Sequence, residues 1–345
     1  MEYSASGDGP SEPMNQTFVS ILACPVCEGD LHLDGDSSPE ELIESGALKC
    51  ADGHSYPIVR GVPRFVSSDG YAANFGFEWN LHNKTQLDTE TRHESEEAFI
   101  EKTGFNPDEL TGKLVLDVGC GMGRFAEVAS RSGATVVGID LTSAIDAAHE
   151  NLKGRSNVFL AQANIFDLPF RDKTFDVIFS IGVLHHTPDT KAAFDQLPRL
   201  LKPGGRIAIW VYASSMMSWA RTSDFYRRLT TRLPKRFLYV LSHIAIPWYY
   251  LGKLPGVGLV FRRILPVSGH PDASWRVLDT FDWYSPTYQW KHSESEVRGW
   301  FEGQELIALR PLSFPTSMQG RRPEAADVQG GTAAGFSAGQ KSTPG

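Results

Sequence analysis

Between residues 113 and 212 the sequence alternates unbroken apolar runs with amphipathic segments, and this alternation constrains the fold more than any other feature. An apolar run without polar alternation must be buried on both faces, which parallel sheets achieve with helices above and below. We therefore expect an α/β domain with a doubly wound parallel sheet. The expected strands are 113–119, 134–140, 157–165, 175–183 and 205–212, and the expected helices are 124–133, 143–153 and 191–202.

The regularity lapses over residues 213–292, which predicts a helical insertion after the fifth strand. A helix is expected at 293–302, a strand at 305–314 and a last short strand at 315–322. The expected division of the chain is a disordered 1–17, a small module 18–66, a lead-in or cap segment 67–111, a main domain 112–317 and a disordered tail 318–345.

Composition narrows the class of protein. Four cysteines among 345 residues are too few for a disulfide framework, so a reducing cytoplasm is the expected location. The polar N-terminus lacks the features of a secretion signal, and no apolar run has the length of a membrane-spanning helix. The formal net charge of −8 argues against general nucleic-acid binding, although residues 221–263 hold nine Lys and Arg against the single acid Asp224. No oligomeric state is predicted.

A glycine turn follows the first strand of the main domain. It reads Gly119-Cys120-Gly121-Met122-Gly123, and Arg124 comes next. Glycine lets the backbone approach a ligand, and the following helix N-terminus is expected to supply free N–H groups. Dinucleotide-binding turns carry G-x-G-x-x-G, whose last position is Arg124 here. The form G-x-G-x-G, preceded by Asp117, instead resembles motif I of class I S-adenosylmethionine methyltransferases.

Later segments extend this resemblance in the family's order: QANIFDLPF (162–170), FDVIFSIGVLHHTPD (175–189) and LLKPGGRIAIW (200–210). It implies a Rossmann-like, seven-stranded sheet and S-adenosylmethionine as cofactor. Asp140, at the end of the second strand, is placed to accept both ribose hydroxyls. Asn164 stands where the family often has Asp beside the adenine. The implied cofactor contacts are Asp117, Gly119, Cys120, Gly121, Gly123, Asp140, Leu141, Asn164, Ile165 and Ser180.

Four residues are candidates for a catalytic base. His185 and His186 follow the fourth strand, at the edge where the methyl group should emerge, although turn structure and packing also explain them. Asp282 and His292 lie in the aromatic segment 277–292, which resembles a segment of bacterial methyltransferases and is expected to line the acceptor site. A base is needed only where the nucleophile must lose a proton.

The small front module carries C-x2-C and C-x3-H. Cys24, Cys27, Cys50 and His54 supply three thiolates and an imidazole, which suit tetrahedral zinc. Four protein ligands close the coordination shell, so the expected zinc is structural, and His32 is a fallback fourth ligand. The module resembles zinc ribbons fused to some methyltransferases, including guanine methyltransferases of ribosomal RNA.

Residues 237–251 contain no Lys, Arg, Asp or Glu and are flanked by basic residues. We favour a helical lid over the acceptor pocket, and the alternative is an amphipathic element in peripheral contact with a membrane. The expected function is methyl transfer to a small-molecule, sugar or lipid-linked acceptor. The alternatives are a ribosomal RNA base methyltransferase, a non-catalytic zinc-ribbon interaction protein and an NAD-dependent oxidoreductase.

Overall fold

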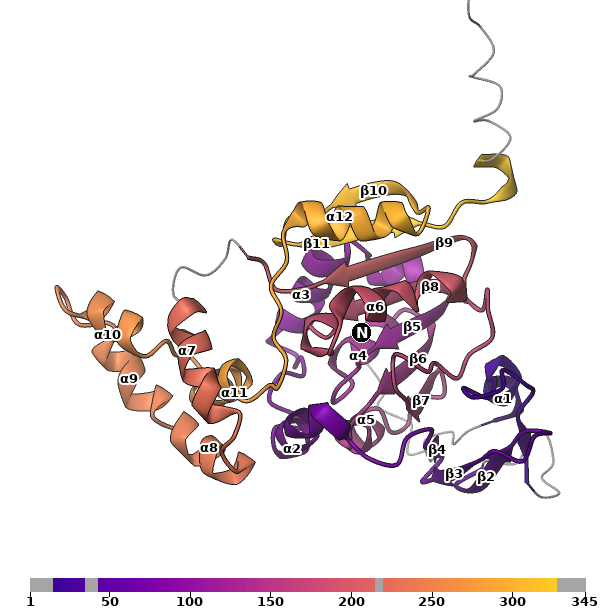
Figure 1. Cartoon of the computed structure of the whole chain (residues 1–345), viewed down its shortest axis with the longest axis horizontal. Coiled ribbons are helices and arrows are strands. Elements are labelled where there is room, and N and C mark those ends of the chain that lie inside the picture. The colour runs from indigo at the N-terminus through magenta and orange to yellow at the C-terminus, as the bar shows by residue number, and fades with distance from the viewer. Residues whose placement is uncertain (1–14, 35–42, 215–219, 328–345) are drawn as a thin grey trace, which may run out of the picture.

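A computed structural model describes residues 15–34, 43–214 and 220–327 of the chain (Figure 1). Its main body is a seven-stranded sheet of order β10-β11-β9-β8-β5-β6-β7. Five strands run parallel, and β10 and β11 pair antiparallel to complete one edge. The strands are β5 (Leu114–Val118), β6 (Thr135–Asp140), β7 (Val158–Gln162), β8 (Phe175–Ile181), β9 (Leu201–Trp210), β10 (Ile307–Pro311) and β11 (Ser317–Arg321). The predicted Rossmann-like, doubly wound fold is confirmed.

Helices cover both faces of the sheet, as unalternating apolar strands require. Leu116 and Val118 of β5 belong to one apolar cluster, and Val115 belongs to the other, because neighbouring strand residues face opposite sides. The first cluster includes α6 (Thr190–Asp195) and α12 (Glu294–Gly303), whereas the second includes α3 (Glu94–Thr103), α4 (Arg124–Ser130) and α5 (Ala144–Asn151).

The front module is a four-stranded antiparallel sheet at the β7 edge of the domain. Phe18 stacks on Phe159 of β7 with ring centroids 5.1 Å apart, and the Phe65 N–H donates to the Gln162 carbonyl. The module therefore shares its core with the main domain. It comprises α1 (Gln16–Ile21), β1 (His32–Leu33), β2 (Ser45–Lys49), β3 (Ser55–Val59) and β4 (Val62–Pro63).

The lead-in segment and the insertion meet beside the carboxyl ends of the parallel strands. The lead-in contributes α2 (Ala73–Leu81) and α3, and the insertion contributes five helices. Figure 1 shows that most of the insertion projects to one side of the sheet. Its helices are α7 (Ala220–Thr230), α8 (Lys235–Ser242), α9 (Ala245–Leu251), α10 (Gly258–Ile264) and α11 (Ala273–Tyr284).

The structure moves some expected boundaries. The helix expected at 191–202 ends at Asp195, because Pro198 opens a 3-10 turn and β9 already begins at Leu201. The disorder expected from residue 318 is wrong for residues 318–321, since β11 pairs with β9 and Met318 is fully buried, and residues 328–345 lie outside the described residues. Helix α1 begins within the range 1–17, which was expected to be disordered. In the part of the chain described, no helix combines the length and apolarity needed to cross a bilayer.

Candidate functional site

The glycine turn links β5 to α4 with three residues at positive φ. The angles are +78° at Gly119, +54° at Gly121 and +88° at Gly123, a region that side chains disfavour. A Cβ on Gly119 would lie 2.4 Å from a methyl group of Val183. Only glycine therefore lets the backbone follow this path without moving its neighbours.

Three N–H groups of this turn donate to the neighbouring strand β6. Those of Gly119 and Cys120 donate to the Ile139 carbonyl at 2.8 and 2.9 Å, and that of Gly121 donates to the Asp140 carboxylate at 2.9 Å. The neighbouring strand therefore satisfies these three donors, and the expectation of free N–H groups at the N-terminus of α4 stays a prediction. Because its glycines lack side chains, the turn still lets a ligand come close to the backbone.

Asp140 ends β6 with its carboxylate held in place. One oxygen accepts from Gly121, and the other accepts from the N–H and hydroxyl of Thr142 at 2.8 and 2.7 Å. Burial raises the pKa of the Asp140 carboxyl, and the hydrogen bonds from Thr142 and Gly121 oppose that rise. Each carboxylate oxygen can accept more than one hydrogen bond, so two ribose hydroxyls can still be bound.

A cavity of about 600 Å³ begins at this turn. It lies at the carboxyl ends of the parallel strands, where ligands bind in doubly wound sheets. Its walls come from the strand ends, α2, α3 and α11. Eight of the predicted site residues line it: Gly119, Cys120, Gly121, Asp140, Leu141, Ile165, His186 and Asp282.

Two predicted cofactor residues lie just behind the cavity. Asp117 is 2% exposed, with one carboxylate oxygen lacking a hydrogen-bond partner, and burial raises the pKa of its carboxyl well above the usual value. Gly123 is the N-cap residue of α4. Both shape the turn from behind rather than lining the cavity.

Asn164 and Ser180 are not among the residues that line the cavity, and their contacts with the cofactor stay predictions. The Asn164 amide oxygen accepts from the Phe166 N–H at 3.2 Å, and its nitrogen donates to Asp167 at 3.0 Å. The Ser180 hydroxyl donates to the Val118 carbonyl at 2.9 Å. The polar atoms of both side chains therefore hydrogen-bond to other groups of the protein.

The three candidate histidines have different surroundings. His185 is fully buried, its ring stacks on Tyr212 with centroids 3.9 Å apart, and both ring nitrogens lack hydrogen-bond partners. Burial lowers the pKa of His185 well below its usual value, so the ring is neutral. Because it does not line the cavity, the structure does not support the predicted role of His185 as a base.

His186 does line the cavity. Its Nδ1 lies 2.9 Å from the Tyr288 carbonyl oxygen, which can only accept, so Nδ1 carries the proton and Nε2 is left as an acceptor. Burial lowers the pKa of His186 to about 4. The ring is therefore a neutral acceptor that binds protons poorly at physiological pH.

His292 joins the insertion to the sheet. Its N–H donates to the Tyr212 carbonyl and its carbonyl accepts from Ser214, both at 2.9 Å, while Nε2 lies 3.0 Å from the Thr190 hydroxyl. It does not line the cavity. The predicted role of His292 as a base is not supported, because its contacts are those of a structural link.

Asp282 has the best geometry for a base. It projects from α11 into the cavity, and its carboxylate accepts from the Tyr212 hydroxyl at 3.2 Å. Burial, with a further contribution from the nearby Asp279 carboxylate, raises the pKa of Asp282 to about 7. A carboxyl with a pKa near neutrality can both hold and release a proton under physiological conditions.

Two further acids beside Asp282 were not predicted. Asp279 lines the cavity one helical turn earlier, accepts from the Ser268 hydroxyl at 2.8 Å, and has its pKa raised to about 6 by burial. Glu78 of α2 is 1% exposed, and neither carboxylate oxygen has a hydrogen-bond partner. Burial raises the pKa of Glu78 well above its usual value, with further contributions from Asp282 and Asp279. The only sequence signal for Glu78 is an acid inside an apolar, aromatic helix.

Aromatic side chains from the lead-in segment, from α11 and from the main domain line the cavity. Lys102 of α3 reaches over the Trp210 ring at 3.8 Å from its centroid, and burial lowers the pKa of Lys102 to about 7. Arg124 donates to the Ser95 hydroxyl and the Gln86 amide oxygen at 3.0 Å each. The aromatic residues that line the cavity are Tyr71, Phe75, Trp79, Phe125, Trp210, Tyr212, Trp275, Trp283 and Phe314.

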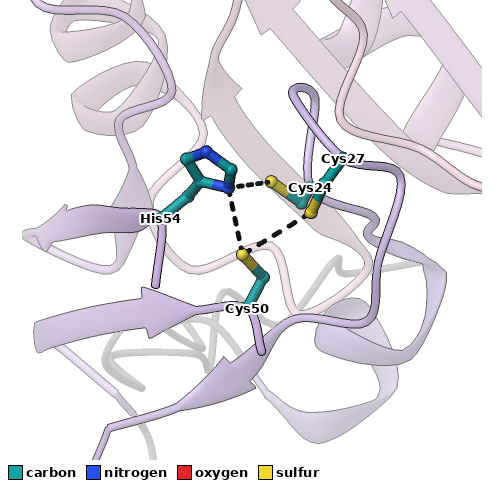
Figure 2. A group of neighbouring side chains, drawn as sticks. All are labelled: Cys24, Cys27, Cys50 and His54. Carbon is teal, nitrogen blue, oxygen red and sulfur yellow. Dashed lines mark hydrogen bonds between the residues drawn. The ribbon is translucent and has the colours of Figure 1, made fainter. Parts of the chain in front are cut away.

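The four predicted zinc ligands lie together in the front module (Figure 2). His54 Nδ1 lies 3.6 Å from Cys24 Sγ and 3.2 Å from Cys50 Sγ, and Cys27 Sγ lies 3.6 Å from Cys50 Sγ. Tetrahedral zinc at its usual bond lengths separates two sulfurs by about 3.8 Å and a sulfur from a nitrogen by about 3.6 Å. These four side chains therefore fit a zinc ion, and His54 completes the set without His32.

Two family models match separate parts of the chain. Residues 116–209 match a family described as methyltransferase domain, and residues 15–61 match one described as Trm112p-like protein. The chain is 36% identical over 111 residues to phosphoethanolamine N-methyltransferase 2 of Caenorhabditis elegans, covering 30% of this chain and 25% of that protein. It is 33% identical over 125 residues to O-methyltransferase resE of Aspergillus sclerotiorum, covering 35% and 47%.

A longer match reaches squalene methyltransferase 1 of Botryococcus braunii, at 28% identity over 254 residues, with 61% of this chain and 66% of that protein covered. One similar solved structure comes from a complex between the Haloferax volcanii Trm112 methyltransferase activator and a candidate methyltransferase. It aligns at 14% identity with a TM-score of 0.43, and the alignment covers 72% of this chain and 98% of that chain. The chain spans a quarter to about half of the first two curated relatives. Residues 116–209 thus form a methyltransferase domain on the class I, Rossmann-like fold, and a Trm112p-like module of the zinc-ribbon type precedes it.

Proposed function

We propose that the protein transfers the methyl group of S-adenosylmethionine to a small-molecule, sugar or lipid-linked acceptor bound against Asp282. The observation that carries this proposal is a single cavity, with the glycine turn and Asp140 at one side and Asp282 at the other. The methyltransferase domain match supports the cofactor half of the proposal. The acids on α11 support the acceptor half.

The chemistry and the positions of the lining residues suit S-adenosylmethionine. Asp140 would hold the ribose hydroxyls, Leu141 and Ile165 would pack against the adenine, and the glycine turn would pass close to the methionine end. When bound, the cofactor supplies a methyl group already activated by the sulfonium charge. The protein then has to orient the acceptor and exclude water, and orientation alone can contribute roughly 7–11 kcal/mol.

On the acceptor side, Asp282 would accept the proton that a hydroxyl or protonated amine must lose. Its raised pKa keeps it half ionised near pH 7, and the Tyr212 hydroxyl fixes the orientation of the carboxylate. Removal of such a base usually slows a reaction by roughly 10²- to 10⁴-fold. The named relatives include an N-methyltransferase and an O-methyltransferase, so both kinds of acceptor atom fit the proposal.

In the front module, zinc would have a structural role, because three thiolates and an imidazole fill a tetrahedral shell. The Tyr56 hydroxyl lies 3.1 Å from Cys24 Sγ and supports that sulfur from outside the cluster. Such a closed site would link the turn after α1, which holds Cys24 and Cys27, to the turn between β2 and β3, which holds Cys50 and His54, and would leave no position open for substrate.

A second candidate is methylation of a ribosomal RNA base, which the Trm112p-like match favours. The experiment that separates the two incubates the protein with methyl-labelled S-adenosylmethionine and a cell extract split into RNA, lipid and small-molecule pools. The proposal expects label in the lipid or small-molecule pool and its loss with Asp282→Asn. Label confined to the RNA pool would overturn the proposed acceptor class. No transfer into any pool, together with preferred binding of NAD, would favour the oxidoreductase alternative.

A further inference from the structure

The insertion holds a concentration of exposed apolar side chains. We define the arm as residues 225–264, which span most of α7 and all of α8, α9 and α10. Of the seventeen large apolar residues exposed in the described part of the chain, twelve belong to the arm. They are Phe225, Leu229, Phe237, Val240, Leu241, Ile244, Tyr250, Leu254, Val257, Leu259, Val260 and Ile264.

Helix α8 and the turn after it show how these side chains are arranged. Leu238, Ser242 and Ala245 are buried, and α8 packs against α11. The opposite side presents an outward stripe at the spacing i, i+3, i+4 and i+7, which places its members on one helix face. Its members and their exposed fractions are Phe237 52%, Val240 65%, Leu241 44% and Ile244 45%. A helical segment that is apolar on both its packed and its outward face is unusual for a surface in water.

The arm is also strongly basic. It contains eight Lys and Arg and no Asp or Glu, so its formal charge is +8 while the rest of the chain carries −16, which together give the net −8. Arg228, Arg236 and Arg263 are exposed. Apolar side chains flanked by cations are the pattern of segments that lie in the headgroup region of anionic bilayers.

The position of the arm connects it to the cavity through α11. Helices α7, α8 and α9 pack against α11, and α10 packs on α9. Figure 1 shows α8, α9 and α10 projecting away from the sheet. Helix α11 itself turns Asp279 and Asp282 into the cavity, whose lining includes no described residue of the arm. The arm is therefore placed behind the cavity wall, and the lid predicted for 237–251 is not seen over the cavity.

We propose that the arm is a peripheral docking surface for an anionic lipid bilayer, with its apolar side chains among the lipid headgroups and its cations on the lipid phosphates. This surface does not depend on the proposed methyl transfer, although it would bring lipid-linked acceptors close to α11. RNA would pair with the cations but leave the apolar stripe in water. A second copy of the chain would place +8 against +8, which opposes association.

The test measures binding of the whole protein to vesicles by co-sedimentation, with no cofactor or acceptor present. One vesicle type is pure phosphatidylcholine, and the other contains phosphatidylglycerol as well. We expect tight binding only to the anionic vesicles, weakened by added salt. Arg236→Gln with Arg263→Gln removes two surface cations, at about 1 kcal/mol each, and should weaken binding by about 30-fold.

The apolar part is tested by Val240→Ser with Ile244→Ser, which should weaken binding by roughly tenfold or more. The matched control is Ile100→Ser on α3, an exposed apolar helix residue outside the arm, which should leave binding unchanged. Affinity for S-adenosylhomocysteine should be the same in all variants, which separates this result from a failure of the proposed function. Absence of vesicle binding would overturn the proposal. So would binding to RNA but not to vesicles that the arm substitutions abolish, or dimers that form through the arm and do not bind vesicles.

Discussion

Replacing Asp282 with Asn should stabilise the folded protein while it removes activity. In the folded protein the pKa of Asp282 rises from its usual 3.8 to about 7, because the carboxyl is buried beside Asp279. A carboxyl with a raised folded-state pKa makes its full contribution to stability below the unfolded value. That stability is lost as the pH rises from about 4 through 7. Asn carries no charge and avoids this loss, and its amide oxygen can still accept from Tyr212.

The magnitude follows from the two pKa values. One pKa unit corresponds to about 1.4 kcal/mol, so the ionised carboxyl destabilises the fold by up to about 4 kcal/mol above pH 7. At pH 5 the same group costs only about 2 kcal/mol, because the folded carboxyl keeps its proton. Asp282→Asn should therefore raise the free energy of unfolding more at pH 8.5 than at pH 5, by about 2 to 3 kcal/mol.

Urea unfolding of wild type and variant at the two pH values measures this difference. Glu90→Gln is the control, since it also replaces a carboxylate by an amide but at an exposed position, in the lead-in segment 67–111. Its substitution should have little effect at either pH. An Asp282→Asn variant no more stable than wild type at pH 8.5, or equally stabilised at both pH values, would refute the account of the acid cluster.

Three further outcomes are expected. Asp279→Asn removes a negative charge that raises the pKa of Asp282. The acid limb of kcat/KM in a pH-rate profile should therefore move to lower pH. An unmoved limb would exclude Asp282 as the titrating base. Asp140→Ala should weaken S-adenosylhomocysteine binding by about 100-fold or more in calorimetry, because two charged hydrogen bonds are lost, and unchanged affinity would exclude the ribose role. Cys50→Ser should lower the zinc content from one ion per chain in elemental analysis, with a loss of thermal stability. Wild-type protein purified without zinc would contradict the metal site.

The strands of the parallel sheet could be predicted because they depend on local patterns. Unalternating apolar runs identify buried parallel strands, and the glycines at 119, 121 and 123 mark a turn that needs positive φ. The C-x2-C and C-x3-H spacing identified all four members of the cysteine–histidine cluster. Each of these signals lies within a few residues or depends on a fixed chemical requirement.

The acceptor side of the cavity could not be predicted in the same way. Glu78 and Asp282 come from helices far apart in the sequence, and only the folding of the lead-in onto the insertion brings them together. Asn164 and His292 have suitable chemistry, but local hydrogen bonds and packing use their side chains elsewhere. The partner of the His292 ring, Thr190, lies 102 residues earlier in the sequence, so no pattern near His292 reveals it.

The most direct measurement of the central claim is a crystal structure of the full protein grown with S-adenosylhomocysteine. The account predicts the ligand in the cavity, with its ribose on the Asp140 carboxylate and its sulfur directed toward the Asp282 side. An empty cavity at saturating ligand, or a nicotinamide dinucleotide bound there in preference, would contradict it.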